Sequence, residues 1–237
     1  FIKLEDYKDD FLRMIYTKNA TNIFRNYPEI MTKIIPYGEQ MLNTSDEDIS
    51  LYERMIINIE NLHYNSKRPT IAAMYILSGK LDKNTTENNY LAKSEEICMK
   101  VLTDFQVKTK LKREIMYIIK NFETDLTKKE NYEPLTGIIG PKAIKEIYGL
   151  RISVAKAYGN EYFSIEKERN KVIELIKNSN IFNINDLVVD GLQLHNLGFV
   201  GEDVGDKLIE VYLKVLEGSI SNTKESIIIY LNKYLKA

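Results

Sequence analysis

The sequence predicts an all-α protein, a multi-helix array with no significant β-sheet. Apolar residues recur with the helical period almost throughout; Leu4, Phe11, Leu12 and Ile15, for example, fall on one helix face. Strand signals are nearly absent, because alternations such as Leu187–Val189 are too brief to form a sheet. The expected connections between helices are short, which suits a packed array better than a bundle of a few long helices.

Prolines and glycines divide the first half of the chain into short helices. Pro28 and Pro36 each end one, because the residue before a proline is pushed out of the helical conformation. Pro69 suits the first turn of another helix. Ser45–Asp48 is expected to begin a helix, since its carboxylates then lie at the end where the helix dipole favours negative charge. The helices expected here span residues 1–18, 19–27, 29–35, 45–59 and 69–79.

The second half is expected to carry longer amphipathic helices. Two polar stretches, Leu81–Asn89 and Asp125–Tyr132, separate them as connectors. Asn222 and Glu225 have the spacing of a capping box, in which each side chain accepts a backbone N–H at a helix start. The helices expected here span residues 93–105, 110–122, 141–158 and 164–178, followed by one after Gly205 that stops at Gly218 and a last one from Asn222.

Composition limits the classes of function open to this chain. It has 237 residues with 33 basic and 34 acidic side chains, so it has no global attraction for nucleic acid, and RNA binding would need a local basic face. The only cysteine, Cys98, is expected to be a buried thiol. Because a single cysteine allows no intramolecular disulfide, and because a signal peptide is lacking, the sequence indicates the reducing environment of the cytoplasm. No apolar run approaches the ~20 residues needed to span a membrane, so no membrane partner is expected.

The last quarter of the chain carries four motifs in a fixed order: DLVVDG at 186–191, LHNLG at 194–198, GEDVG at 201–205 and LEGSISNTKESI at 216–227. These motifs resemble the C-terminal region of bacterial CCA-adding tRNA nucleotidyltransferases, which share a family with bacterial poly(A) polymerases. Residues 5–36 similarly resemble the neck segment of that family.

The middle of the chain resembles the same family with one departure. RPTIAAMYILSGKL, at 68–81, is similar to a segment in which many relatives carry a His-Asp pair that binds a divalent metal. Here Tyr75 and Ile76 replace the pair, and neither can ligate a hard cation. The metal site is therefore expected to be absent, which argues against the alternative of a His-Asp phosphohydrolase.

The resemblance implies three segments and a role. Residues 1–43 correspond to the neck, 44–136 to a body with a degenerate His-Asp-like helical core, and 137–237 to the tail. The implied role is to hold the acceptor arm and TΨC region of tRNA, and so to position the tRNA 3′ end for an N-terminal nucleotidyltransferase head. Magnesium and ATP or CTP would bind that head, which the resemblance places before Phe1. The alternatives are the corresponding part of a poly(A) polymerase and a stand-alone helical module that binds RNA or protein.

No catalytic residue and no cofactor is expected within the chain itself. Nucleotidyl transfer needs two metal ions held by carboxylates, typically Asp-x-Asp after a Gly-Ser element, and that sequence does not occur here. The two histidines, His63 and His195, lack a partner at metal-ligand spacing. His63 is expected near a helix end, and His195 is expected to pack or to cap a helix. The chain is therefore predicted to be inactive alone.

Two groups of residues are candidates for RNA contact. The first is a cluster of four basic residues at a helix start, all expected to be exposed. The helix dipole disfavours cations at that position, which indicates a use other than stability. The second is a glycine-rich turn that could bring backbone N–H groups to a phosphate, although neighbouring acids oppose this. A solvated surface is the alternative for the first group. The candidates are Lys108, Lys110, Lys112 and Arg113 in the first group, and Gly201, Gly205 and Lys207 in the second.

Overall fold

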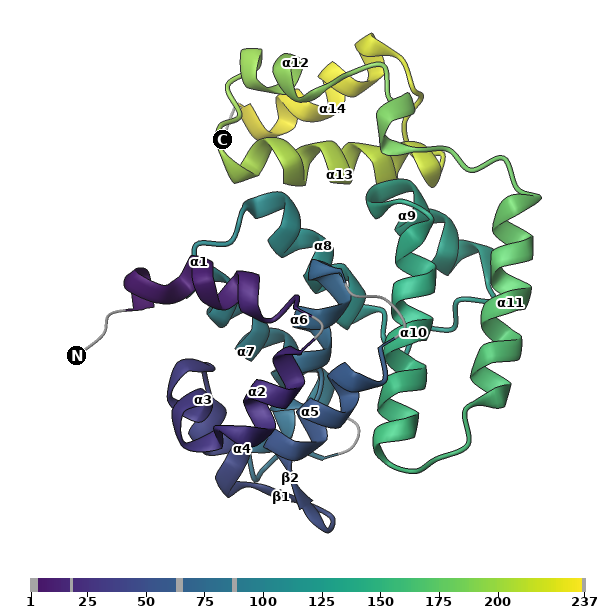
Figure 1. Cartoon of the computed structure of the whole chain (residues 1–237). Helices are drawn as coiled ribbons and strands as arrows, with labels where there is room; N and C mark the ends of the chain where they lie inside the picture. The colour runs from purple at the N-terminus through teal and green to yellow at the C-terminus, as the bar shows by residue number, and fades with distance from the viewer. Residues whose placement is uncertain (1–3, 18, 63–65, 87–88, 236–237) are drawn as a thin grey trace. The chain divides into compact units, whose positions relative to one another are not determined.

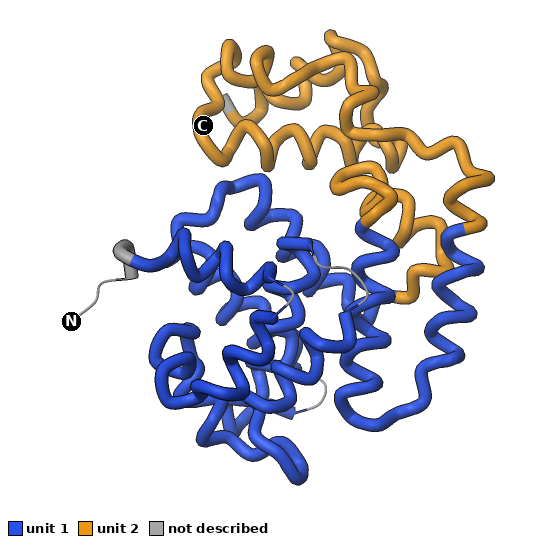
Figure 2. The backbone as a smooth tube through the Cα atoms, in the orientation of Figure 1, with its two compact units in different colours: residues 1–124, 143–173 blue, residues 125–142, 174–237 orange. Residues whose placement is uncertain are grey.

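The computed structural model describes residues 4–17, 19–62, 66–86 and 89–235. Within these ranges the chain is a helical array with one two-stranded sheet, so the all-α prediction is confirmed (Figure 1). The chain divides into two compact units, coloured separately in Figure 2. Unit 1 comprises residues 1–124 and 143–173, and unit 2 comprises residues 125–142 and 174–237. The division into neck, body and tail stays a prediction.

Unit 1 is built around α6, whose residues Pro69–Tyr75 are all buried. A helix that is apolar on all sides has to lie inside a fold, and α6 packs against α5, α7 and α8. The elements of this unit are α1 (Leu4–Met14), α2 (Ala20–Asn26), α3 (Pro28–Ile34), α4 (Gly38–Asn43), β1 (Ser45–Asp46), β2 (Ile49–Ser50), α5 (Leu51–Glu60), α6 (Lys67–Tyr75), the 3₁₀ helix η1 (Ser78–Leu81), α7 (Tyr90–Asp104), α8 (Thr109–Lys120), α10 (Lys142–Ala157) and most of α11 (Phe163–Lys177).

Unit 2 has its own apolar core. The ring of Tyr212 is fully buried and stacks on Phe182 with the ring centroids 5.6 Å apart, while its hydroxyl donates to the Phe182 carbonyl at 3.0 Å. Around this pair lie Leu187, Val189, Leu194, Phe199, Val211, Ile227 and Leu231. The elements of this unit are α9 (Lys129–Ile139), η2 (Ile184–Asp186), α12 (Gly191–Asn196), α13 (Glu202–Leu216) and α14 (Lys224–Leu235).

The expected helix start at Ser45 is wrong. Residues 45–50 form an antiparallel hairpin in which Ser45 pairs with Ser50 and Asp46 with Ile49. Helix α5 begins only at Leu51, because the Ser50 hydroxyl accepts the Glu53 N–H at 3.1 Å and acts as the N-cap. The acidic run 46–48 therefore does not cap a helix.

Two further local predictions are corrected. The expected connector 125–132 overlaps α9, which begins at Lys129 because Tyr132 and Leu135 gain burial as part of a helix. The capping box expected at Asn222 does not form. Asn222 instead accepts the Val188 N–H and donates to the Asp186 carbonyl, both at 3.0 Å, and Thr223 accepts the Ser226 N–H at 3.3 Å.

Candidate functional site

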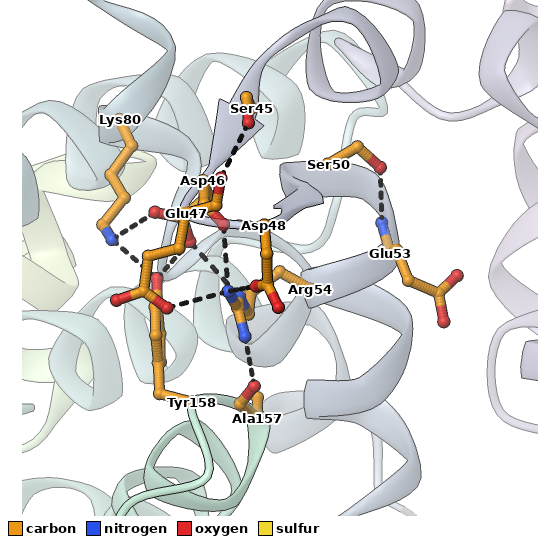
Figure 3. Close-up of polar contacts among 10 residues, drawn as sticks. All are labelled: Ser45, Asp46, Glu47, Asp48, Ser50, Glu53, Arg54, Lys80, Ala157 and Tyr158. Atoms are coloured by element: carbon orange, nitrogen blue, oxygen red, sulfur yellow. Dashed lines mark hydrogen bonds and ion pairs between the residues drawn. The ribbon is translucent and has the colours of Figure 1, made fainter.

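A buried network of charged side chains lies where the 45–50 hairpin meets α5, η1 and the end of α10 (Figure 3). Arg54 and Asp46 are 4% and 8% exposed. Nη2 of Arg54 donates to the backbone carbonyl of Asp46 at 2.9 Å, and Nε lies 3.4 Å from the Asp46 carboxylate. Nη1 donates to the carbonyl of Ala157. The guanidinium therefore ties the hairpin to the end of α10.

Lys80 and Tyr158 complete this network. Nζ of Lys80 donates to the Asp46 carboxylate at 2.7 Å and to the Tyr158 hydroxyl at 2.6 Å, and that hydroxyl donates to Asp46. The ring of Tyr158 also lies 4.2 Å from the Arg54 guanidinium and 4.7 Å from Lys80 Nζ, within the range of cation–π attraction. Burial, followed by the hydrogen bond to Asp46, raises the pKa of Tyr158, so its hydroxyl stays protonated and acts as a donor.

An open polar cleft of about 540 Å³ adjoins the network in unit 1. Lys80 and Tyr158 line it together with Tyr90, whose hydroxyl donates to Glu123 at 3.2 Å. Glu47 also lines the cleft; it lies at the hairpin turn with a left-handed φ of 61°, and its carboxylate is 3.1 Å from Nη2 of Arg54. The remaining lining residues are Leu77, Val154 and Asn160. These groups can form hydrogen bonds to a small polar molecule.

The basic cluster predicted at residues 108–113 lies at the start of α8, in unit 1. Lys108 and Lys110 are exposed, as expected. Lys112 and Arg113 are only partly exposed, which corrects the expectation for that half of the cluster. Lys112 falls three residues before the fully buried Ile115, on the helical face that packs inward. Only the first half of the cluster is therefore a fully exposed basic surface.

The predicted glycine turn lies at the start of α13, in unit 2. Gly201 is the N-cap with φ of 60°, and Gly205 is already within the helix. Lys207 pairs with Glu210 at 2.7 Å, and its Nζ lies 3.3 Å from the centroid of the Tyr234 ring. The side chain of Lys207 is thus engaged in holding α13 against α14.

The remaining candidate residues fall outside any site. Cys98 is fully buried, as predicted, and burial raises the pKa of its thiol. His195 is exposed in the last turn of α12, so the packing role expected for it is wrong; Leu194 packs into the core in its place. His63 lies outside the described residues.

Tyr75 and Ile76, which stand at the His-Asp position of the resemblance, are 2% and 0% exposed. Their side chains fill core space in unit 1. Among the described residues, no group of three or more His, Cys, Asp or Glu side chains is placed to hold a metal ion. Within the same residues, no helix combines the length and apolar character required to cross a bilayer.

Sequence reasoning missed the Asp46, Arg54, Lys80 and Tyr158 network. The available signal was an isolated Arg54 within the apolar face of α5, where a charge requires a partner.

Comparison of the chain with protein-family models, with curated proteins and with solved structures finds no match.

Proposed function

We propose that this chain is the tRNA-binding C-terminal part of a CCA-adding tRNA nucleotidyltransferase. Its role is to position the tRNA 3′ end for nucleotide addition by a separate head. The observation that carries the proposal is the placement of the four tail motifs, because each coincides with a helix boundary of unit 2.

The motifs account for the turns between successive helices. DLVVDG ends at the start of α12, where the Asp190 carboxylate accepts the Gln193 N–H at 2.9 Å as the N-cap. LHNLG ends that helix, and GEDVG supplies Gly201 as the N-cap of α13. LEGSISNTKESI runs from the end of α13 to the start of α14. Glycine, asparagine, aspartate and serine favour helix caps and turns. The motifs therefore have a structural role at the boundaries of these helices, and this supports reading them as one ordered tail.

Exposed cations at the start of α8 support the tRNA part of the proposal. Lys108 is the N-cap and Lys110 the second residue of that helix, and both are exposed. No acidic side chain lies in the first turn of α8 to neutralise them. A protein of net charge −1 has to attract phosphate through such a local surface.

The test is the binding of the full chain to folded tRNA as a function of salt concentration. If about three phosphates are neutralised, log affinity falls with log salt at a slope of roughly −3. The double variant Lys108→Ala/Lys110→Ala is expected to make this slope shallower by roughly 1.5 to 2. The matched control is Lys33→Ala/Lys83→Ala, which removes two exposed lysines elsewhere in unit 1 and should keep the slope.

Two results would count against the proposal. One is the absence of tRNA binding by the wild-type chain at low salt. The other is nucleotide addition to tRNA by the purified chain alone, because the proposal assigns that chemistry to the head.

A further inference from the structure

An exposed aromatic pair stands at the junction of α10 and α11. Phe163, the first residue of α11, is 64% exposed. Its ring stacks on that of Tyr162, with the centroids 4.8 Å apart and an interplanar angle of 30°. On Tyr162, Nζ of Lys156 lies 4.4 Å from the ring centroid. The pair is thus a small aromatic surface that carries a cation at one side.

The backbone beneath this surface is held by polar contacts. The Glu161 carboxylate accepts from the Phe163 N–H and from the Ser164 hydroxyl, the latter at 3.2 Å. Helices α10 and α11 are joined by Glu168, which accepts from the Tyr148 hydroxyl at 2.5 Å and lies 3.6 Å from Arg151. Figure 1 shows the two helices side by side, and residues 158–162 connect them. The rings are therefore presented from fixed elements.

Further cations continue from Phe163 along α11. Lys167 and Lys171 follow Phe163 at intervals of four residues, so the three side chains share one face of the helix. Both lysines are exposed. Glu166 and Glu168 flank Lys167 in the sequence. Glu168 is engaged with Tyr148 and Arg151, and Glu161 is engaged at the start of the helix. An exposed π-surface is thereby followed by two positive charges, one and two helical turns away.

We propose that Tyr162 and Phe163 form a stacking platform for an unpaired base of single-stranded RNA. Lys156, Lys167 and Lys171 attract the phosphates on either side of that base. Aromatic side chains bind single strands by stacking because every base has a π-face, and nearby cations follow the backbone. The identification of the RNA as tRNA rests on the proposed function; the recognition of an unpaired base rests on the platform alone.

The test is the binding of the full chain to a fluorescein-labelled oligoribonucleotide of about eight nucleotides, measured by anisotropy over a range of salt concentrations. Phe163→Ala is expected to weaken binding by about 5- to 150-fold, the range for loss of one stacked base, and to leave the salt slope unchanged. Phe163→Tyr should retain affinity. Lys167→Ala/Lys171→Ala should instead make the slope shallower by roughly 1.4, since each single-strand phosphate contributes about 0.7.

Three controls separate stacking from charge and from loss of fold. An oligonucleotide of abasic residues keeps the phosphates but offers no base, so Phe163→Ala should not weaken its binding further. Leu192→Ala removes a side chain that is 69% exposed in unit 2 and should bind as the wild type does. Circular dichroism of Phe163→Ala should match the wild type, because the ring is mostly exposed.

The platform and the proposed function fail in different ways. If Phe163→Ala binds the oligonucleotide as tightly as the wild type, or the wild type does not bind it, the platform is wrong even where folded tRNA is bound. If the oligonucleotide is bound through Phe163 but folded tRNA is not bound, the platform stands and the tRNA assignment is wrong.

Discussion

Asp46 and Lys80, 34 residues apart in the chain, are joined by a hydrogen bond of 2.7 Å from the ammonium group to a carboxylate that is almost fully buried. The contact links the 45–50 hairpin to η1. The same carboxylate lies against Arg54, which is itself 4% exposed. Asp46 therefore balances two cations at the edge of the polar cleft.

Removal of Asp46 is expected to destabilise unit 1. In Asp46→Ala, Arg54 is left buried with less compensation for its charge, and breaking a buried pair in this way costs about 3–5 kcal/mol. The control is Asp48→Ala, because that side chain also lies near Arg54, at 3.6 Å, but is 88% exposed. It should change stability by less than about 1 kcal/mol. Chemical denaturation followed by circular dichroism measures both, and equal effects would contradict the assigned role of Asp46.

Two buried tyrosines in unit 1 should respond oppositely to loss of the hydroxyl. Tyr75 and Tyr52 are each 2% exposed. The Tyr75 hydroxyl has no hydrogen-bond partner among the described residues, whereas that of Tyr52 donates to the Phe24 carbonyl at 3.0 Å. Tyr75→Phe is expected to be neutral or stabilising, and Tyr52→Phe to destabilise by about 0.5–1.5 kcal/mol. A larger loss for Tyr75→Phe in denaturant titrations would show that its hydroxyl is satisfied.

Gly137 is expected to tolerate no side chain. A Cβ at this position of α9 would lie 1.9 Å from the Tyr212 hydroxyl and 2.7 Å from the Phe182 carbonyl, both of which belong to the core of unit 2. Gly137→Ala should therefore destabilise unit 2 by about 1–3 kcal/mol through overpacking. Gly191→Ala is the control, because its Cβ would meet only Val204, at 3.4 Å, and helix propensity favours alanine. Similar melting temperatures for the two variants would rule out the close approach at Gly137.

Glu210 is expected to make unit 2 sensitive to acid. Partial burial acts to raise the pKa of Glu210, but hydrogen bonds from Lys207, Tyr230 and Tyr234 outweigh it and lower the pKa from 4.5 to about 2. A carboxylate whose pKa is lower in the folded state stabilises that state above its unfolded pKa. This stabilisation is therefore present above about pH 4.5 and is lost as the pH falls toward about 2.

The pH dependence can be measured with one variant and one control. Glu210→Gln should flatten the fall in unfolding midpoint between about pH 4.5 and pH 2. Glu225→Gln, at an exposed position of α14, should leave the fall unchanged. If NMR titration shows the Glu210 carboxyl protonating near pH 4.5, the three hydrogen bonds do not act as described.

The sequence by itself determined the helical class, the approximate positions of most helices and the burial of Cys98. These depend on local periodicity and on prolines and glycines, which act within a few residues. It placed the basic cluster correctly at the start of α8, but it did not show that Lys112 and Arg113 are partly covered by the fold.

Only the tertiary structure decided the 45–50 hairpin, the cleft beside it and the aromatic platform. Locally, the acids of residues 46–48 suit a helix start, but the partners of Asp46 are Arg54, Lys80 and Tyr158, which approach from separate elements. Likewise, Lys156 and Tyr162 meet only because the chain turns between α10 and α11. Burial of a charge is favourable only when its partners are in place, and their positions depend on the packing of segments distant in the chain.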